Sequence, residues 1–286
     1  MTAIATHPPV VLLHGWPVTQ EHWRHLIPAL TRAGFICMPI TLPGLGTPPP
    51  SPTSFRKTNL ATWVLDTLTA KGVERFALIG HDWGATVAAH VASKLPDAVT
   101  ALVIEEETLP GVAVDLASPG VDHYPSWHGP FNRAPQLAEQ LVPGNEAAYY
   151  GTFLTQSAGP AGLDADILRN YVTAYSSEGV LDAGLGYYRT READIADTRQ
   201  LDIHPIKTPT LAIGGKFAMS ASVEAGMRLL ATDVTGIILE RSGHYPAEQE
   251  PERTAETIAS FLALHNNWPG NEGEIQGTPL PLDVRE

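Results

Sequence analysis

The chain of 286 residues has very little cysteine: Cys37 is the only one, so no disulfide can form within the chain. This is typical of a protein in a reducing compartment. Basic residues are also scarce, because 18 Lys and Arg stand against 31 Asp and Glu and give a net charge of -13. Such a surface repels phosphate backbones, so we do not expect nucleic acid as a partner.

Long hydrophobic runs and cofactor motifs are missing as well. The apolar run at residues 10–13 is too short for a signal peptide or a membrane span, and no basic region precedes it. We therefore expect a cytoplasmic protein that does not contact a membrane. The sequence shows no zinc-type spacing of His and Cys, no phosphate-binding loop and no dinucleotide fingerprint, so we expect neither a metal nor another cofactor.

Apolar runs alternate with amphipathic segments along most of the chain, which is typical of an α/β fold with a mostly parallel sheet flanked by helices. The apolar runs predict strands at residues 10–13, 35–40, 76–79, 99–104, 210–213 and 236–239. The segments between them predict helices at residues 21–33, 57–71, 85–94, 222–231 and 252–265.

The alternation breaks between residues 104 and 210, where far more chain intervenes than the roughly twelve residues that a βα crossover needs. This stretch is rich in aromatic residues and has helical patterns at residues 136–141, 146–156, 165–176 and 181–189. We interpret it as an inserted helical cap over the carboxyl ends of the strands, where ligands of α/β proteins bind. The predicted organisation is a core of residues 1–112 and 204–265, a cap of residues 113–203, and a surface tail of residues 266–286.

The most informative motif is Gly80-His81-Asp82-Trp83-Gly84, at the end of a predicted strand and the start of a predicted helix. Asp82 in this position could simply cap the helix. The Gly-x-nucleophile-x-Gly frame, however, marks a sharp turn that presents a nucleophile above the sheet.

A serine that attacks a saturated carbon would form an ether that water does not cleave, whereas a carboxylate forms an ester that water does cleave. Aspartate is also ionised at neutral pH, since its reference pKa is about 3.9. Asp82 therefore predicts a substrate with an electrophilic saturated carbon, either an epoxide or an alkyl halide.

Two further segments supply groups that ester hydrolysis needs. His14-Gly15-Trp16 follows the first predicted strand, and the backbone N–H groups of Trp16 and Trp83 are the expected oxyanion hole. His244 follows the last predicted strand, in Ser242-Gly243-His244, where a general base is expected. The alternatives are an ordinary βα turn for the first segment and a surface turn for the second.

A catalytic histidine also needs an acid that fixes its tautomer. No carboxylate follows the fifth predicted strand, but Glu105, Glu106 and Glu107 follow the fourth. Three adjacent carboxylates are often a solvated charge run. Because these three directly follow a buried strand, we favour Glu106 as the acid, with Glu107 as the alternative.

Together these motifs resemble the epoxide hydrolases of the α/β-hydrolase fold, to which haloalkane and haloacid dehalogenases are related. The segments that carry the resemblance are residues 14–17, 80–85, 106–111, 186–189 and 242–246. The resemblance covers most of residues 8–265 and implies an α/β-hydrolase fold. Only nine residues precede Val10, so we expect the sheet to lack the antiparallel strand pair that the family usually has before the His-Gly segment, or the start of the sequence to be truncated.

The resemblance also implies that hydroxyl groups of the cap protonate the departing epoxide oxygen. Tyr188, in the Tyr-Arg motif, matches one of the expected tyrosines. The second expected tyrosine is absent, and Trp127 and His128 lie near its place. The candidates for the second donor are His128, Tyr149 and Tyr150, and these three residues and Trp127 are the candidates for substrate contact.

The activity implied is that of a hydrolase acting on ether bonds, which converts a small epoxide into a vicinal diol through an alkyl ester on Asp82. A haloalkane dehalogenase with the same nucleophile is the first alternative, with the indoles of Trp83 and Trp127 as halide ligands. A binding protein that uses this fold without catalysis is the second. Either a monomer or a homodimer is compatible with the sequence.

Overall fold

A parallel sheet forms the centre of the molecule in the computed structural model, which describes residues 8–50, 54–114 and 124–265. Its six strands have the order β2-β1-β3-β4-β5-β6, and every neighbouring pair is parallel. The strands are β1 (Val10–Leu13), β2 (Cys37–Ile40), β3 (Phe76–His81), β4 (Val99–Glu105), β5 (Thr210–Gly215) and β6 (Val234–Leu239). The prediction of an α/β fold with a parallel sheet is confirmed. No strand precedes β1 in the part of the chain that the structure describes, so β2 forms one edge of the sheet.

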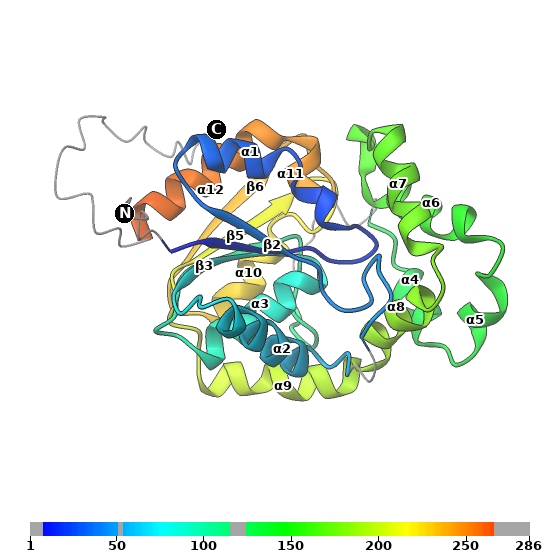
Figure 1. Ribbon diagram of the computed structural model, residues 1–286, viewed down its shortest axis with the longest axis horizontal. Coiled ribbons are helices and arrows are strands. Elements are labelled where there is room, and N and C mark those ends of the chain that lie inside the picture. Colours follow the sequence, from blue (N-terminus) through cyan, green and yellow to red (C-terminus); the bar gives the residue numbers. More distant parts are fainter. Residues whose placement is uncertain (1–7, 51–53, 115–123, 266–286) are drawn as a thin grey trace.

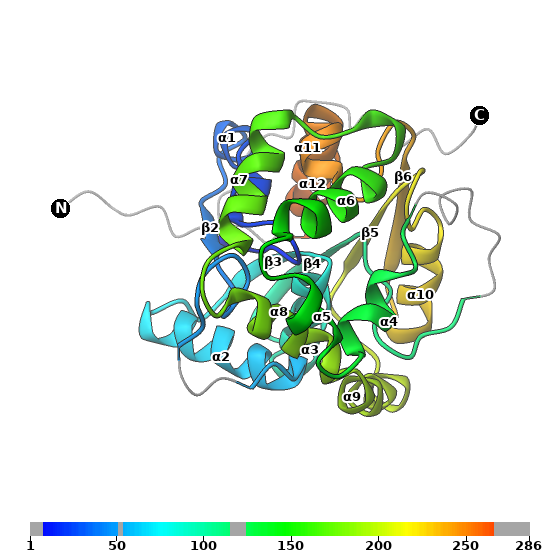
Figure 2. The ribbon, with the colours of Figure 1, turned by 90° about the vertical axis from the view of Figure 1, so that its right-hand side faces the viewer.

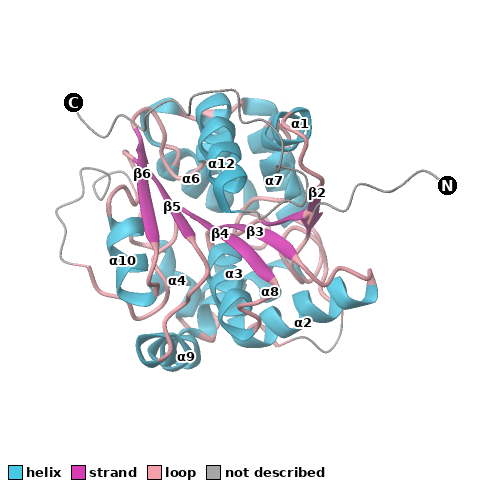
Figure 3. Ribbon diagram, turned by 90° about the vertical axis from the view of Figure 1, so that its left-hand side faces the viewer, coloured by secondary structure: helices cyan, strands magenta, loops and turns pink. Residues whose placement is uncertain are grey.

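Helices cover both faces of this sheet, as Figure 3 shows. One face carries α1 (Leu26–Arg32) and α12 (Pro251–His265), with the short helices η1 (Gln20–Trp23) and α11 (Pro246–Gln249) nearby. The other face carries α2 (Lys57–Ala70), α3 (Trp83–Lys94) and α10 (Ser222–Leu230). Successive residues of β1 pack into different cores, with Val10 and Leu12 on the first face and Val11 and Leu13 on the second. Because both faces are buried, the strands are continuously apolar in the sequence.

A group of helices, here called the inserted helices, lies beyond the carboxyl ends of the strands, on the right in Figure 1 and facing the viewer in Figure 2. They are α4 (His128–Arg133), α5 (Leu137–Leu141), α6 (Glu146–Ser157), α7 (Ala165–Tyr175) and α8 (Val180–Arg189), with a short 3₁₀ turn η2 (Gly159–Ala161) between α6 and α7. The last helix of the segment, α9 (Arg191–Ile203), runs back under α2 toward the core. No helix among the described residues is long and apolar enough to cross a bilayer.

Two local expectations differ from the structure. The helix expected at residues 21–33 is two pieces, η1 and α1, and the first piece buries His22 beside Glu105 and Glu248. Helices α4 and α9 were not expected, because α4 contains a glycine and a proline, and α9 buries polar Asp194 and Thr198. The tail expected at residues 266–286 lies outside the described residues.

Candidate active site

Asp82 occupies a sharp turn between β3 and α3. Its backbone has φ 51° and ψ -128°, a conformation that costs energy for a residue with a side chain. A Cβ on Gly80 would lie 2.5 Å from the Ala85 Cα, and one on Gly84 would lie 2.2 Å from the Leu13 carbonyl oxygen. The turn therefore needs glycine on both sides of Asp82, as the motif predicts. The Asp82 side chain forms no capping hydrogen bond with α3, which argues against the helix-capping interpretation.

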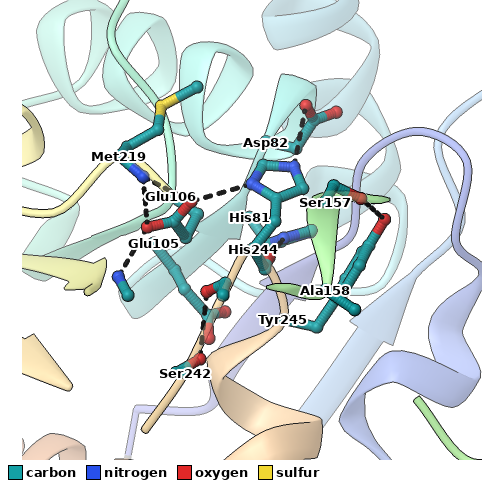
Figure 4. Close-up of polar contacts among 12 residues, drawn as sticks. His81, Asp82, Glu105, Glu106, Ser157, Ala158, Met219, Ser242, His244 and Tyr245 are labelled. Atoms are coloured by element: carbon teal, nitrogen blue, oxygen red, sulfur yellow. Dashed lines mark hydrogen bonds and ion pairs between the residues drawn. The ribbon is translucent and has the colours of Figure 1, made fainter. Parts of the chain in front are cut away.

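Figure 4 shows Asp82, His244 and Glu106 in a line at the carboxyl ends of β3 and β4. Asp82 Oδ1 accepts a hydrogen bond from the Trp16 backbone N–H at 2.7 Å. Asp82 Oδ2 lies 3.5 Å from His244 Nε2, and His244 Nδ1 lies 2.9 Å from Glu106 Oε2. All of these side chains are buried. The structure thus brings together residues that are far apart in the sequence, in the order that the prediction requires.

The three consecutive glutamates have different partners. Besides the contact with His244, Glu106 accepts N–H bonds from Gly215 at 2.6 Å and from Met219 at 3.2 Å. Glu105 instead faces His22, with 3.4 Å between His22 Nε2 and Glu105 Oε2. Glu107 is also buried, and both its burial and the nearby Asp82 charge raise its pKa well above the usual value. Because none of the three is exposed, they are not a solvated charge run.

The charge state of His244 follows from its two carboxylate neighbours. Burial lowers the pKa of His244, but the attraction of the Asp82 and Glu106 carboxylates outweighs burial and raises the pKa to about 9. The ring is therefore an imidazolium at neutral pH. Its backbone is held as well, because His81 Nε2 donates to the His244 carbonyl at 2.7 Å and the His244 N–H donates to the Ser157 carbonyl at 2.9 Å.

Aromatic side chains surround the Asp82 carboxylate. The ring of Tyr188 meets Trp16 at a centroid distance of 5.4 Å and Trp83 at 5.2 Å, edge to face in both pairs. Burial, together with the Asp82 charge, raises the pKa of Tyr188 well above its usual value, so the hydroxyl keeps its proton. The indole N–H of Trp83 is buried and has no hydrogen-bond partner among the described residues. Two groups that can donate a hydrogen bond therefore lie near the nucleophile.

The structure separates the other predicted contact residues into two sets. His128 stacks on Trp16 at 6.0 Å and lies 5.7 Å from the Tyr188 ring. In contrast, the Trp127 indole donates to Gln156 at 2.9 Å, and the Tyr149 hydroxyl donates to Asn132. Tyr150 packs its ring against Tyr149 and Tyr175. His128 is thus beside the candidate proton donor, whereas the polar atoms of Trp127 and Tyr149 already have partners among the inserted helices.

Three residues near the site were not predicted from the sequence. The Tyr124 ring lies 4.8 Å from the His244 ring, and the Phe153 ring lies 4.7 Å from Trp16. Lys57 Nζ lies 4.1 Å from the centroid of the Trp83 ring. The aromatic-rich composition of the insertion indicates that some aromatic residues reach the site but does not show which ones, and nothing in the local sequence marks Lys57. No group of His, Cys, Asp and Glu side chains among the residues described could hold a metal ion.

Comparison with known proteins agrees with this fold. A family model described as the alpha/beta hydrolase family matches residues 10–257. The chain belongs to the alpha/beta hydrolase family. Within it, a soluble epoxide hydrolase of Corynebacterium sp. (strain C12) is 28% identical over 263 residues, covering 89% of this chain and 90% of the relative.

Solved structures lead to the same family. The epoxide hydrolase CorEH without ligand is 28% identical, with a TM-score of 0.80, over 90% of this chain and 92% of that chain. Wild-type Cfl2 from Burkholderia cenocepacia is 27% identical, with a TM-score of 0.82, over 90% and 89% of the two chains. The resemblance inferred from the motifs is confirmed at the level of the hydrolase family.

Proposed function

We propose that the protein is an epoxide hydrolase that converts a neutral epoxide into a vicinal diol through an alkyl ester on Asp82. The observation that carries the proposal is an aspartate on the nucleophile turn, aligned with His244 and Glu106, with the Tyr188 ring packed against Trp16 and Trp83 beside it. The names of the relatives that match over most of the chain support it. Residues 113–203 supply Tyr188 and His128 and are proposed to act as the cap.

The first half-reaction opens the epoxide ring. The Asp82 carboxylate attacks a ring carbon, so that one C–O bond forms and the ring C–O bond breaks. Tyr188 donates its hydroxyl proton to the departing oxygen, and His128 is placed beside it as a second polar group. The buried carboxylate of Asp82 disfavours anionic substrates, so the expected epoxides are uncharged.

The second half-reaction hydrolyses the ester. Alkylation neutralises Asp82, which is one of the groups that raise the pKa of His244. The imidazolium then gives up its proton more readily, and this proton restores the Tyr188 hydroxyl. The neutral ring, oriented by Glu106, takes a proton from water. The water attacks the Asp82 carbonyl carbon while the N–H groups of Trp16 and Trp83 stabilise the oxyanion. The leaving oxygen, which is an original Asp82 oxygen, takes the proton that His244 took from water, and the diol departs. The new Asp82 carboxyl group passes its proton to His244, which restores the carboxylate and the imidazolium.

The alternatives are less well supported by the geometry. A halide site would use two indole N–H groups, but the N–H of Trp127 is bonded to Gln156, so that only Trp83 has a free donor. A binding protein without catalysis has no need of the aligned series Asp82, His244 and Glu106. The alignment of that series favours an enzyme.

A product assay tests the proposal. The protein is incubated with a panel of uncharged epoxides and of bromoalkanes, and diol and bromide are measured. We expect diol from epoxides and loss of that activity in Asp82→Ala. Bromide release without diol would establish a dehalogenase instead, and ligand binding that yields no product and is unaffected by Asp82→Ala would establish a binding protein.

A further inference from the structure

Lys57 is a cation with no solvent exposure at the start of α2. Its ammonium donates to Asp194 Oδ2 at 2.8 Å, to Thr190 Oγ1 at 3.1 Å and to the Tyr187 carbonyl oxygen. The same ammonium lies over the face of the Trp83 indole. A single charge therefore contacts the residue after the nucleophile and the residue before the candidate proton donor Tyr188.

Asp194 completes a closed network with this cation. Its Oδ1 accepts a hydrogen bond from the backbone N–H of Lys57 at 2.9 Å, and its Oδ2 accepts one from the Thr190 hydroxyl at 2.8 Å. Asp194 is in α9, Thr190 joins α8 to α9, and Lys57 is in α2, which Figure 1 shows directly above α9. The network thus joins the core helices to the end of the helix that carries Tyr188.

Stability alone does not account for this pair. Removing two charges from water costs about as much as their attraction returns, so a buried ion pair is weak support for a fold. The cation also approaches an aromatic face, where it is attracted to the ring electrons and fixes the ring in place. The contacts therefore favour a role in geometry near Asp82.

We propose that Lys57 and Asp194 are positioning residues for the ring-opening step. The ammonium contacts the face of the Trp83 indole and donates a hydrogen bond to the Tyr187 carbonyl. These two contacts fix the position of the Tyr188 hydroxyl relative to Asp82. Tyr187 supports the same arrangement, because its hydroxyl donates to the Pro43 carbonyl at 2.8 Å. This inference rests on the proposed function, since it assigns the pair to one of its two half-reactions.

The chain offers a matched control for this pair. Arg56, the residue just before α2, and Asp197 in α9 form the neighbouring ion pair, but the Arg56 side chain is 43% exposed. The test variant is Lys57→Met with Asp194→Leu, which leaves no unpaired buried charge. The control variant is Arg56→Met with Asp197→Leu. Where the test variant fails to fold, Lys57→Gln with Asp194→Asn removes the charges and keeps polar contacts.

The two half-reactions are measured separately in proteins whose folding is checked by circular dichroism. Alkylation is followed by intact-protein mass spectrometry in a His244→Gln background with an epoxide that the parent protein turns over. Ester hydrolysis is followed by quench flow with native His244. We expect the test variant to slow alkylation by roughly 10- to 100-fold, because small displacements of reacting groups have effects of this size. Ester hydrolysis in the test variant, and both steps in the control, should change by less than about threefold.

An unchanged alkylation rate in the folded test variant would overturn the inference, and so would an equal loss in both half-reactions. If His244→Gln itself forms no adduct, the proposed function fails and the inference fails with it. The two failures are distinguishable because the second appears before any change at Lys57 is made.

Discussion

The identity of one side chain, Asp82, determines which substrates the site can attack. The glycines beside it permit the turn, and the backbone of Trp16 and the ring of His244 position its two oxygens. His244 in turn depends on Glu106, which is fixed by N–H groups of Gly215 and Met219. Each residue of the series is therefore oriented by the next one, and the last is held by the backbone.

Glu106→Gln tests this dependence at one residue. The substitution keeps the size of the side chain but removes a carboxylate that raises the pKa of His244. We expect the pKa of His244, measured by NMR titration, to fall below about 9. Ester hydrolysis should slow by roughly 10²- to 10⁴-fold because the base is no longer oriented. Glu105→Gln is the control, since Glu105 faces His22, and a His244 pKa that is unchanged in Glu106→Gln would contradict the account.

Among the elements, strands were easier to predict than the insertion. The four inner strands, β1, β3, β4 and β5, are buried along their whole length, and each has an apolar run in the sequence. The edge strands β2 and β6 are partly buried and also contain apolar runs. The site residues that were found lie next to those strands: Asp82 follows β3, Glu106 follows β4 and His244 follows β6. Their position could be predicted because parallel strands bring their carboxyl ends to one edge of the sheet.

Helix α9 shows why other parts could not be predicted. Asp194 and Thr198 are buried in it, and they break the apolar pattern that indicates an amphipathic helix. Asp194 can be buried only because Lys57, 137 residues earlier, supplies the opposite charge. Such long-range pairs leave no local signal in either segment. The place of Tyr124 beside His244 likewise depends on contacts between distant elements.

The loop that carries His244 depends on the inserted helices. A Cβ on Gly243 would lie 2.4 Å from the Ala158 carbonyl oxygen, just after α6. The Gln249 amide donates to that carbonyl at 2.7 Å and accepts the Gly243 N–H at 2.8 Å. Hydrogen bonds to backbone groups therefore connect the loop that carries His244 with the end of α6.

Across the whole molecule, several histidines are buried as neutral rings. Burial is the largest influence on His14, His90 and His128, and it lowers the pKa of each from 6.5 to about 4. Each such group binds fewer protons in the folded than in the unfolded state at intermediate pH. Its contribution to stability is therefore present above about pH 6.5 and is lost as the pH falls toward 4.

His90→Leu tests this pH dependence away from the active site. The ring nitrogen Nε2 of His90 is buried in α3 and has no partner among the described residues. We expect the loss of unfolding free energy between pH 6.5 and 4.5, measured by urea denaturation, to be smaller in the variant by about 2 kcal/mol. The exposed His25→Leu serves as control and should leave the loss unchanged. An equal loss in His90→Leu and the parent protein would show that His90 is not held neutral by burial.

The central claim is that Asp82 forms a covalent ester whose carbonyl carbon is attacked by water. A single turnover of an epoxide in water enriched in heavy oxygen tests it, with mass spectrometry of the diol and of the peptide that contains Asp82. The account predicts heavy oxygen in the Asp82 carboxylate and unlabelled diol. Heavy oxygen in the diol together with an unlabelled Asp82 peptide would show that water attacks the substrate directly, and would contradict the account.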